Sequence, residues 1–218
     1  MRYFSWAAFY EGPSDALYLD VLLPRLIRDL VARDGTDIVE VPDVPMARFG
    51  ASGRSVEKIA EEACAFRDVC DAVFIHADTG GRGLERGIAH RSDAYCIALG
   101  NCCGWPAERC ITLIPRHETE AWLLADGEAV TSALGYHGRP AEVGLPSDAR
   151  AAERLGDPKK TLRAAVEAIT GRRRRQPIDN IFPAIAQRQQ LDLLRRSQSF
   201  MQFEERLRAC LRTTGCIQ

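Results

Sequence analysis

Four short apolar segments, separated by helical patterns, constrain the fold of this chain more than any other feature of its sequence. They cover residues 3–10, 37–41, 72–77 and 110–115. The last two are almost uninterrupted apolar runs, which is typical of strands buried on both faces of a parallel sheet. Strand–helix–strand alternation predicts an α/β fold with a mostly parallel sheet flanked by helices.

Helical patterns fill the intervals between these strands. Apolar residues recur at helical spacing over residues 13–33, 54–69 and, more weakly, 84–99. Pro24 interrupts the first of these helices, so we expect a kink or a break near residue 20.

The strand pattern stops after residue 117. Helices are predicted over residues 118–126, 158–170, 180–196 and 199–211. The Gly- and Pro-rich stretch 135–157 is expected to be a loop. We therefore expect an α/β domain over residues 1–126 and a helical lobe over residues 127–218 packed on it, unless the two form one continuous domain.

An acid follows the first strand in the stretch "FYEGPSD". The strand delivers Glu11 at its carboxyl end, and Gly12 permits a tight turn. Pro13 suits the first position of a helix, and the helix dipole favours the anionic Asp15 in the first turn. The alternative is that Glu11 and Asp15 only cap this helix.

A second acid, Asp78, follows the third strand in "FIHADTGGRG". The carboxyl ends of parallel strands share one edge of the sheet, so Glu11 and Asp78 converge if their strands are neighbours. Paired carboxylates repel one another unless a proton or a cation lies between them. Oxygen ligands of this kind suit Mg²⁺ or Mn²⁺. The alternative for Asp78 is a turn-forming acid ahead of Gly80 and Gly81.

Two more acids, Glu118 and Glu120, open the helix that follows the fourth strand. They reach the same edge of the sheet if that strand is also parallel. The alternative is the ordinary enrichment of acids in a first helical turn. His76 and His117 flank these acidic segments and are candidate ligands, although a lone histidine is more often structural.

Basic residues gather in two places. Lys159 and Lys160 open a helix, where the dipole disfavours cations, so a phosphate is a candidate partner. Four consecutive arginines, Arg172, Arg173, Arg174 and Arg175, could contact a nucleic-acid backbone. For both groups the alternative is a solvated surface.

The cysteines show no spacing typical of a zinc site. An alternative zinc set would combine Cys102, Cys103, Cys110 and His117. A cytosolic chain of this size does not need disulfides, so we expect buried, reduced thiols.

Charge and hydropathy exclude several classes of protein. The net charge of −1 gives no overall attraction to nucleic acid, so only a local basic patch could bind it. No apolar run approaches the roughly 20 residues of a membrane-spanning helix, and the N-terminus lacks a signal-peptide pattern. We expect a cytoplasmic protein without a membrane partner.

The segments "EGPSD", "HAD" and "ETEAWLLAD" together resemble a bacterial family related to the TOPRIM (topoisomerase–primase) domain. Within it, the chain looks similar to the nuclease part of the overcoming-lysogenization-defect enzymes and to a branch found beside ATPases in anti-phage defence loci. "DPKK" and "SFMQFEERL" also resemble that branch, so the resemblance covers nearly the whole chain.

The resemblance implies a TOPRIM-like fold, with a Glu after the first strand that matches Glu11 and a D-x-D pair after a later strand. This chain departs from that pair, because Asp78 supplies one acid only. Either Gly80 replaces the second acid or His76 replaces the first. Glu120 matches the acid of the family's E-x-E-A-W segment and could compensate, as could Glu118.

The sequence therefore predicts a metal-dependent phosphodiester hydrolase, a DNA nuclease of an anti-phage defence system. Glu11 and Asp78 are expected to hold Mg²⁺ or Mn²⁺, with Glu118, Glu120 and Asp15 as further ligands. Lys160 or Lys159 would offset charge that develops in the transition state. The alternative is a non-catalytic module that binds a nucleotide or nucleic acid and regulates a partner ATPase.

Overall fold

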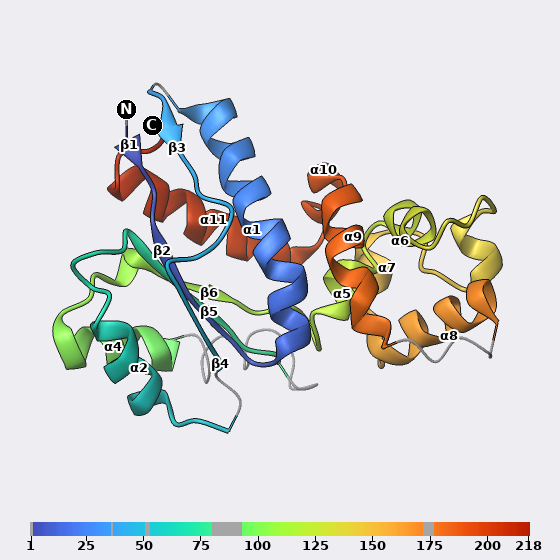
Figure 1. Ribbon diagram of the computed structural model, residues 1–218, viewed down its shortest axis with the longest axis horizontal. Coiled ribbons are helices and arrows are strands. Elements are labelled where there is room, and N and C mark those ends of the chain that lie inside the picture. The colour runs from blue at the N-terminus through green and yellow to red at the C-terminus, as the bar shows by residue number, and fades with distance from the viewer. Residues whose placement is uncertain (1, 36, 51–52, 80–92, 172–176) are drawn as a thin grey trace.

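The computed structural model describes residues 2–35, 37–50, 53–79, 93–171 and 177–218. Its centre is a four-stranded parallel sheet with helices on both faces and further helices towards the C-terminus (Figure 1). The predicted α/β class is thereby confirmed. Within the described ranges, no helix is both long and apolar enough to cross a membrane.

The sheet has the strand order β4-β2-β5-β6. Its strands are β2 (Trp6–Tyr10), β4 (Ala47–Gly50), β5 (Ala72–His76) and β6 (Cys110–Leu113). All residues of β2, β5 and β6 are buried, as expected for parallel strands covered on both faces. The expectation of parallel strands at residues 72–77 and 110–115 is confirmed.

Alternate residues of the central strand β2 enter two different cores. Trp6, Ala8 and Tyr10 belong to the core beneath one face of the sheet, while Ala7 and Phe9 belong to the core on the other face. Helices α1 (Pro13–Asp34) and α11 (Gln198–Thr213) cover the first face. Helices α2 (Val56–Cys64) and α4 (Asp93–Cys103) cover the second (Figure 1).

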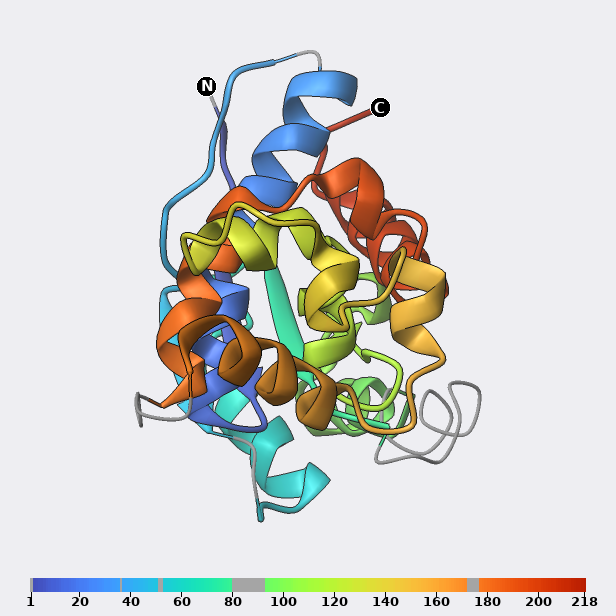
Figure 2. The ribbon, with the colours of Figure 1, turned by 90° about the vertical axis from the view of Figure 1, so that its right-hand side faces the viewer.

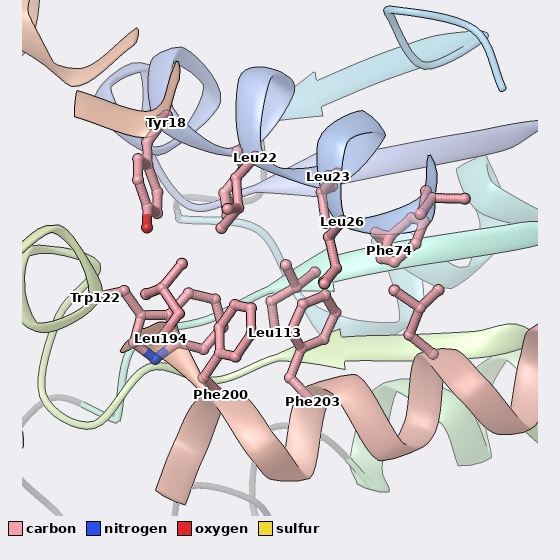
Figure 3. Close-up of a cluster of buried hydrophobic side chains, with 14 of the residues drawn as sticks. Tyr18, Leu22, Leu23, Leu26, Phe74, Leu113, Trp122, Leu194, Phe200 and Phe203 are labelled. Carbon is pink, nitrogen blue, oxygen red and sulfur yellow. The ribbon is translucent and has the colours of Figure 1, made fainter. Parts of the chain in front are cut away.

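The larger core joins the two ends of the chain. Phe203 of α11 packs against Phe74 of β5, with ring centroids 6.4 Å apart, and stacks on Trp122 at 5.6 Å. Leu22 and Leu26 of α1 face these rings from the opposite side (Figure 3). The C-terminal helix α11 is therefore part of the packing around the sheet, whereas the predicted boundary near residue 126 stays a prediction.

Helix α1 runs without interruption through Pro24, so a break near residue 20 is wrong, while the alternative of a kink stays a prediction. A proline inside a helix removes one backbone hydrogen bond. Here Leu22, Leu23, Leu26 and Ile27 are completely buried on both sides of the proline. Burial of these side chains against the sheet offsets the missing bond.

The predicted first strand, residues 3–10, is divided in two. β1 (Arg2–Tyr3) pairs with β3 (Val39–Glu40) in a separate two-stranded sheet, and β2 starts only at Trp6. The predicted strand 37–41 thus lies outside the main sheet. In the main sheet, β2 pairs instead with β4, a strand that was not predicted from the sequence.

Two predicted helices of the sheet domain have different bounds. α2 ends at Cys64, and hydrogen-bonded turns replace the helix expected as far as residue 69. The helix predicted over 84–99 lies partly outside the described residues; within them, α4 runs from Asp93 to Cys103.

The second half of the chain is helical, as predicted, but in shorter pieces. Helices α6 to α9 form the side that faces the viewer in Figure 2. The predicted helix 118–126 is reduced to one turn, and 180–196 is split into three elements. The predicted loop 135–157 contains η3 and α7, which corrects that expectation. The bounds are η2 Ala107–Arg109, α5 Glu120–Leu123, α6 Gly127–Ala133, η3 Pro140–Val143, α7 Ala149–Glu153, α8 Pro158–Thr170, η4 Ile178–Ile181, α9 Phe182–Arg188 and α10 Leu191–Leu194.

Four cysteines form disulfides, which corrects the expectation of reduced thiols for them, whereas Cys70, Cys210 and Cys216 are buried and free, as expected. Cys64 of α2 is bonded to Cys103 of α4, and Cys96 of α4 is bonded to Cys110 of β6. These bonds occupy two members of the alternative zinc set, Cys103 and Cys110, so that set is not formed. Cys102 is a free, exposed thiol. Helix packing brings these pairs together across 39 and 14 residues, which spacing along the sequence does not reveal.

Candidate metal centre

The topology brings the carboxyl ends of β2 and β5 together. From β2 the chain passes to β4 on one side and later to β5 and β6 on the other side. The β2–β5 boundary is therefore the switch point at which open α/β sheets bind their ligands. Glu11 follows β2 and Asp78 follows β5, and the Asp78 N–H donates to Glu11 Oε2 at 2.9 Å. The expected convergence of these two acids is confirmed.

Glu11, His76 and Asp78 form the one group of three metal-ligating side chains found within the described parts of the chain. One ligand atom of each lies within 4.8 Å of the other two. Asp78 Oδ1 is buried, and apart from the 3.4 Å contact with His76 Nε2 it has no partner among the described residues. Such an oxygen is costly unless a cation or water satisfies it. Two carboxylates and an imidazole suit a divalent ion, so the residues fit the expected metal.

The His76 imidazole is held on both sides. Its Nδ1 lies 3.4 Å from the Glu11 N–H nitrogen and 3.6 Å from Asp15 Oδ2. Its Nε2 lies 3.0 Å from Thr119 Oγ1 and 3.4 Å from Asp78 Oδ1. Burial lowers the pKa of His76, but the close contact with Asp78 and the charges of Asp15, Asp78 and Glu11 outweigh it, so the pKa is raised overall.

Asp15 lies behind His76 and is not a member of the three-residue group. Its Oδ2 accepts the Gly12 N–H at 2.8 Å at the start of α1, and its Oδ1 accepts the Thr119 hydroxyl at 2.7 Å. Asp15 therefore caps the start of α1, while its contacts with Thr119 and His76 go beyond capping. Its predicted role as a metal ligand stays a prediction, and in this structure its Oδ2 lies 3.6 Å from Nδ1 of His76.

Glu118 and Glu120 lie near the group without joining it. Glu120 is buried, and Lys159 Nζ lies 3.7 Å from its Oε1. Burial raises the pKa of Glu120 to about 7, although its own backbone N–H and Lys159 lower it. Burial and the charge of Asp78 likewise raise the pKa of Glu118 against the effect of Lys159. The two acids and the lysine thus form a charged flank beside the group.

Replacing Glu120 by glutamine is expected to remove a pH dependence of stability. The pKa of Glu120 is about 7 in the folded protein, against an ordinary value of 4.5 for a glutamate of the unfolded chain. Between these values the folded protein binds more protons, so stability falls as the pH rises through this window. We expect wild type to lose about 2 kcal/mol between pH 5 and pH 8 that Glu120→Gln does not lose.

Urea denaturation of both proteins at the two pH values measures this difference in the free energy of unfolding. Glu128→Gln, which changes an exposed glutamate on α6, is the matched control and should behave as wild type. Equal losses in wild type and Glu120→Gln would contradict the raised pKa.

The two lysines predicted to bind a phosphate, Lys159 and Lys160, point in different directions from the first turn of α8. Lys159 reaches Glu120, whereas Lys160 is exposed and its backbone N–H is capped by Asp157 at 2.7 Å. Both border a cavity of about 590 Å³, together with Arg163. The cavity is lined by His117, Glu118, Gly156, Asp157, Pro158, Lys159, Lys160 and Arg163. The predicted cluster Arg172, Arg173, Arg174 and Arg175 lies outside the described residues.

Two threonines and one backbone geometry at this site were not predicted from the sequence. Thr119 joins His76 to Asp15, and Thr79 accepts the His117 N–H at 2.8 Å. His117 has a positive φ of 69°, a conformation that is uncommon for non-glycine residues and concentrated at functional sites. Nothing in the sequence separates Thr119 from an ordinary residue at a helix start. The sequence signal for this part of the site was that His117 directly precedes the acid Glu118.

Comparisons with known proteins identify no relative from which a role for these residues could be transferred. No family model matches the chain, and neither the curated proteins nor the solved structures contain a significant match.

Proposed function

We propose that this chain is a metal-dependent phosphodiester hydrolase with a TOPRIM-like fold, and that it is a DNA nuclease of a bacterial anti-phage defence system. The observation that carries the proposal is the meeting of Glu11, His76 and Asp78 at the switch point of the sheet. The buried Asp78 Oδ1, which accepts no hydrogen bond from a described residue, supports a cation at this place. The positions of Glu11 and Asp78 agree with the resemblance in "EGPSD" and "HAD".

In this proposal Glu11 and Asp78 hold the divalent ion. When bound, the ion polarises the phosphodiester and favours deprotonation of the attacking water. Because the described residues supply one group of three ligands, the geometry supports one ion at this position. In this proposal Glu118 and Glu120 lie near the ion but do not bind it.

Glu120 accepts the proton of the attacking water. A general base works best when its pKa lies near the working pH, and burial brings the pKa of Glu120 to about 7. Lys159, 3.7 Å from Glu120, offsets negative charge that develops on the phosphate. Lys160 and Arg163 border the adjoining cavity, where they attract the neighbouring phosphates of a nucleic acid.

A cleavage assay tests the proposal. Purified protein is incubated with supercoiled plasmid, linear duplex and single-stranded DNA, with Mg²⁺, Mn²⁺ or a chelator. We expect cleavage of at least one substrate that depends on the metal and stops in the chelator. Absence of cleavage under every condition, together with ion binding, would favour the non-catalytic partner of an ATPase instead.

A further inference from the structure

His76 is the residue of the site that the resemblance does not explain. It stands two residues before Asp78, at the end of β5, where the D-x-D pattern has its first acid if Asp78 is the second. Asp78 lies just beyond the strand, and the two side chains meet, with Nε2 of His76 3.4 Å from Oδ1 of Asp78. The His76 side chain is fully buried there among Asp15, Asp78 and Thr119.

The Nε2 atom of His76 and the Oδ1 atom of Asp78 are spaced as two ligands of one ion, which would replace the 3.0 Å contact between Nε2 and Thr119 Oγ1. Nε2 and Oδ1 lie 3.4 Å apart. Two adjacent ligands of an octahedral ion are separated by about 3 Å when each is about 2.1 Å from it. Asp78 Oδ1 has no hydrogen bond from a described residue. A carboxylate oxygen of Glu11 lies within 4.8 Å of a ligand atom of His76 and of one of Asp78.

The other nitrogen of His76 faces a carboxylate, that of Asp15, at a distance slightly longer than a hydrogen bond. Ligating imidazoles donate their second N–H to a carboxylate or carbonyl, which fixes the tautomer and the ring orientation. Asp15 Oδ2 lies 3.6 Å from Nδ1, and Asp15 is itself anchored by Thr119 at 2.7 Å and Gly12 at 2.8 Å. In this structure Nδ1 accepts the Glu11 N–H at 3.4 Å, so the proposed tautomer exchanges this long hydrogen bond for one from Nδ1–H to Asp15.

We propose that His76 binds the ion directly through Nε2, that Asp15 orients it through Nδ1–H, and that the resulting set of two carboxylates and one imidazole selects Mn²⁺ over Mg²⁺. The inference rests on the proposed metal site. Carboxylates and water suit both Mn²⁺ and Mg²⁺, but an imidazole nitrogen binds first-row transition metals, Mn²⁺ least strongly among them, better than it binds Mg²⁺. His76 therefore changes the metal preference of a site whose oxygen ligands alone would also accept Mg²⁺.

Pulsed electron paramagnetic resonance of the protein with one equivalent of Mn²⁺ tests the direct bond. A coordinated imidazole gives a ¹⁴N modulation of the echo, which carboxylates and water do not give. We expect this signal in wild type and its loss in His76→Asp, while His137→Asp, which changes an exposed histidine, keeps it. Bound Mn²⁺ without ¹⁴N modulation in wild type would overturn the proposal, whether or not the variant folds.

Calorimetric titration with Mn²⁺ and with Mg²⁺ tests the selectivity and the role of Asp15. We expect the ratio of Mn²⁺ to Mg²⁺ affinity to fall about tenfold in His76→Asp, because the imidazole is replaced by an oxygen ligand. Asp15→Asn should keep the ¹⁴N signal and weaken Mn²⁺ binding by about 10- to 100-fold. An unchanged ratio in His76→Asp would contradict the selectivity. A ¹⁴N signal without DNA cleavage would contradict only the hydrolase proposal.

Discussion

Asp78→Asn is expected to lower metal-dependent DNA cleavage by about 10²- to 10³-fold, the scale on which removal of one electrostatic contact to the reacting group acts. Asparagine has nearly the same shape and keeps the backbone N–H that donates to Glu11 Oε2 at 2.9 Å. It removes the negative charge that, with Glu11, attracts the divalent ion. The loss would therefore report on ion binding rather than on a displaced loop.

The same exchange at Asp68 is the matched control. Asp68 is exposed and forms an ion pair with the adjacent Arg67, far from the edge of the sheet that carries Glu11. Initial rates on plasmid DNA in Mn²⁺, together with calorimetric Mn²⁺ titration, compare the two variants with wild type. Full activity of Asp78→Asn, or an equal loss in Asp68→Asn, would show that Asp78 does not hold the ion.

Glu153→Ala is expected to destabilise the protein by about 4 kcal/mol and to lower its melting temperature by roughly 10 °C. Glu153 is the last residue of α7, and its carboxylate lies at the start of α11. It accepts the hydroxyls of Ser197 at 2.7 Å and Ser199 at 2.5 Å, and the N–H groups of Gln198 and Ser199, both at 2.9 Å. Alanine would remove the acceptor of four donors, of which those of Ser197 and Ser199 belong to buried residues.

The pH dependence of this effect has a defined sign. Burial raises the pKa of Glu153, but the hydrogen bonds from Ser199 and Ser197 outweigh it and leave the pKa below its usual value. The contribution of Glu153 is therefore complete above the unfolded pKa of about 4.5 and is lost as the pH falls through the lower folded value. The difference between wild type and Glu153→Ala should thus shrink in acid.

Thermal melts at neutral and acid pH measure both effects. Glu167→Ala removes an exposed carboxylate from α8 and should stay within about 0.5 kcal/mol of wild type. Glu153→Gln keeps one acceptor oxygen and should fall between Glu153→Ala and wild type. A Glu153→Ala protein that melts with wild type at neutral pH would contradict the capping of α11 by this residue.

The part of the site that the sequence could predict is the part set by sheet topology. Glu11 and Asp78 each follow a buried apolar strand, and parallel strands end on one edge, so their meeting follows from general rules. Asp15, His76 and Thr119 are different, because their relation depends on how far α1 and the segment after β6 approach β5. That approach is decided by tertiary packing and leaves no periodic pattern in the sequence.

The missed strand β4 shows the same limit for the fold. It has four residues, alternates between partly buried and exposed positions, and carries Arg48 at its centre. Such an edge strand lacks the apolar run that identified β2 and β5. α7 and the two disulfides were missed for a related reason, since five-residue helices and cysteine pairing depend on contacts that are distant along the chain.

The direction of α1 separates the two ends of the chain from the proposed site. α1 starts beside Glu11 and ends at Asp34, whose carbonyl accepts the Gln218 N–H at 3.3 Å, while Arg2 contacts the carbonyl of Thr214. Both ends therefore lie together at the far end of this helix (Figure 1), about 33 Å from its start. A tag or fused protein joined at either end would therefore lie away from the edge of the sheet that carries Glu11 and Asp78. It would not block the approach of a long polymer to that edge.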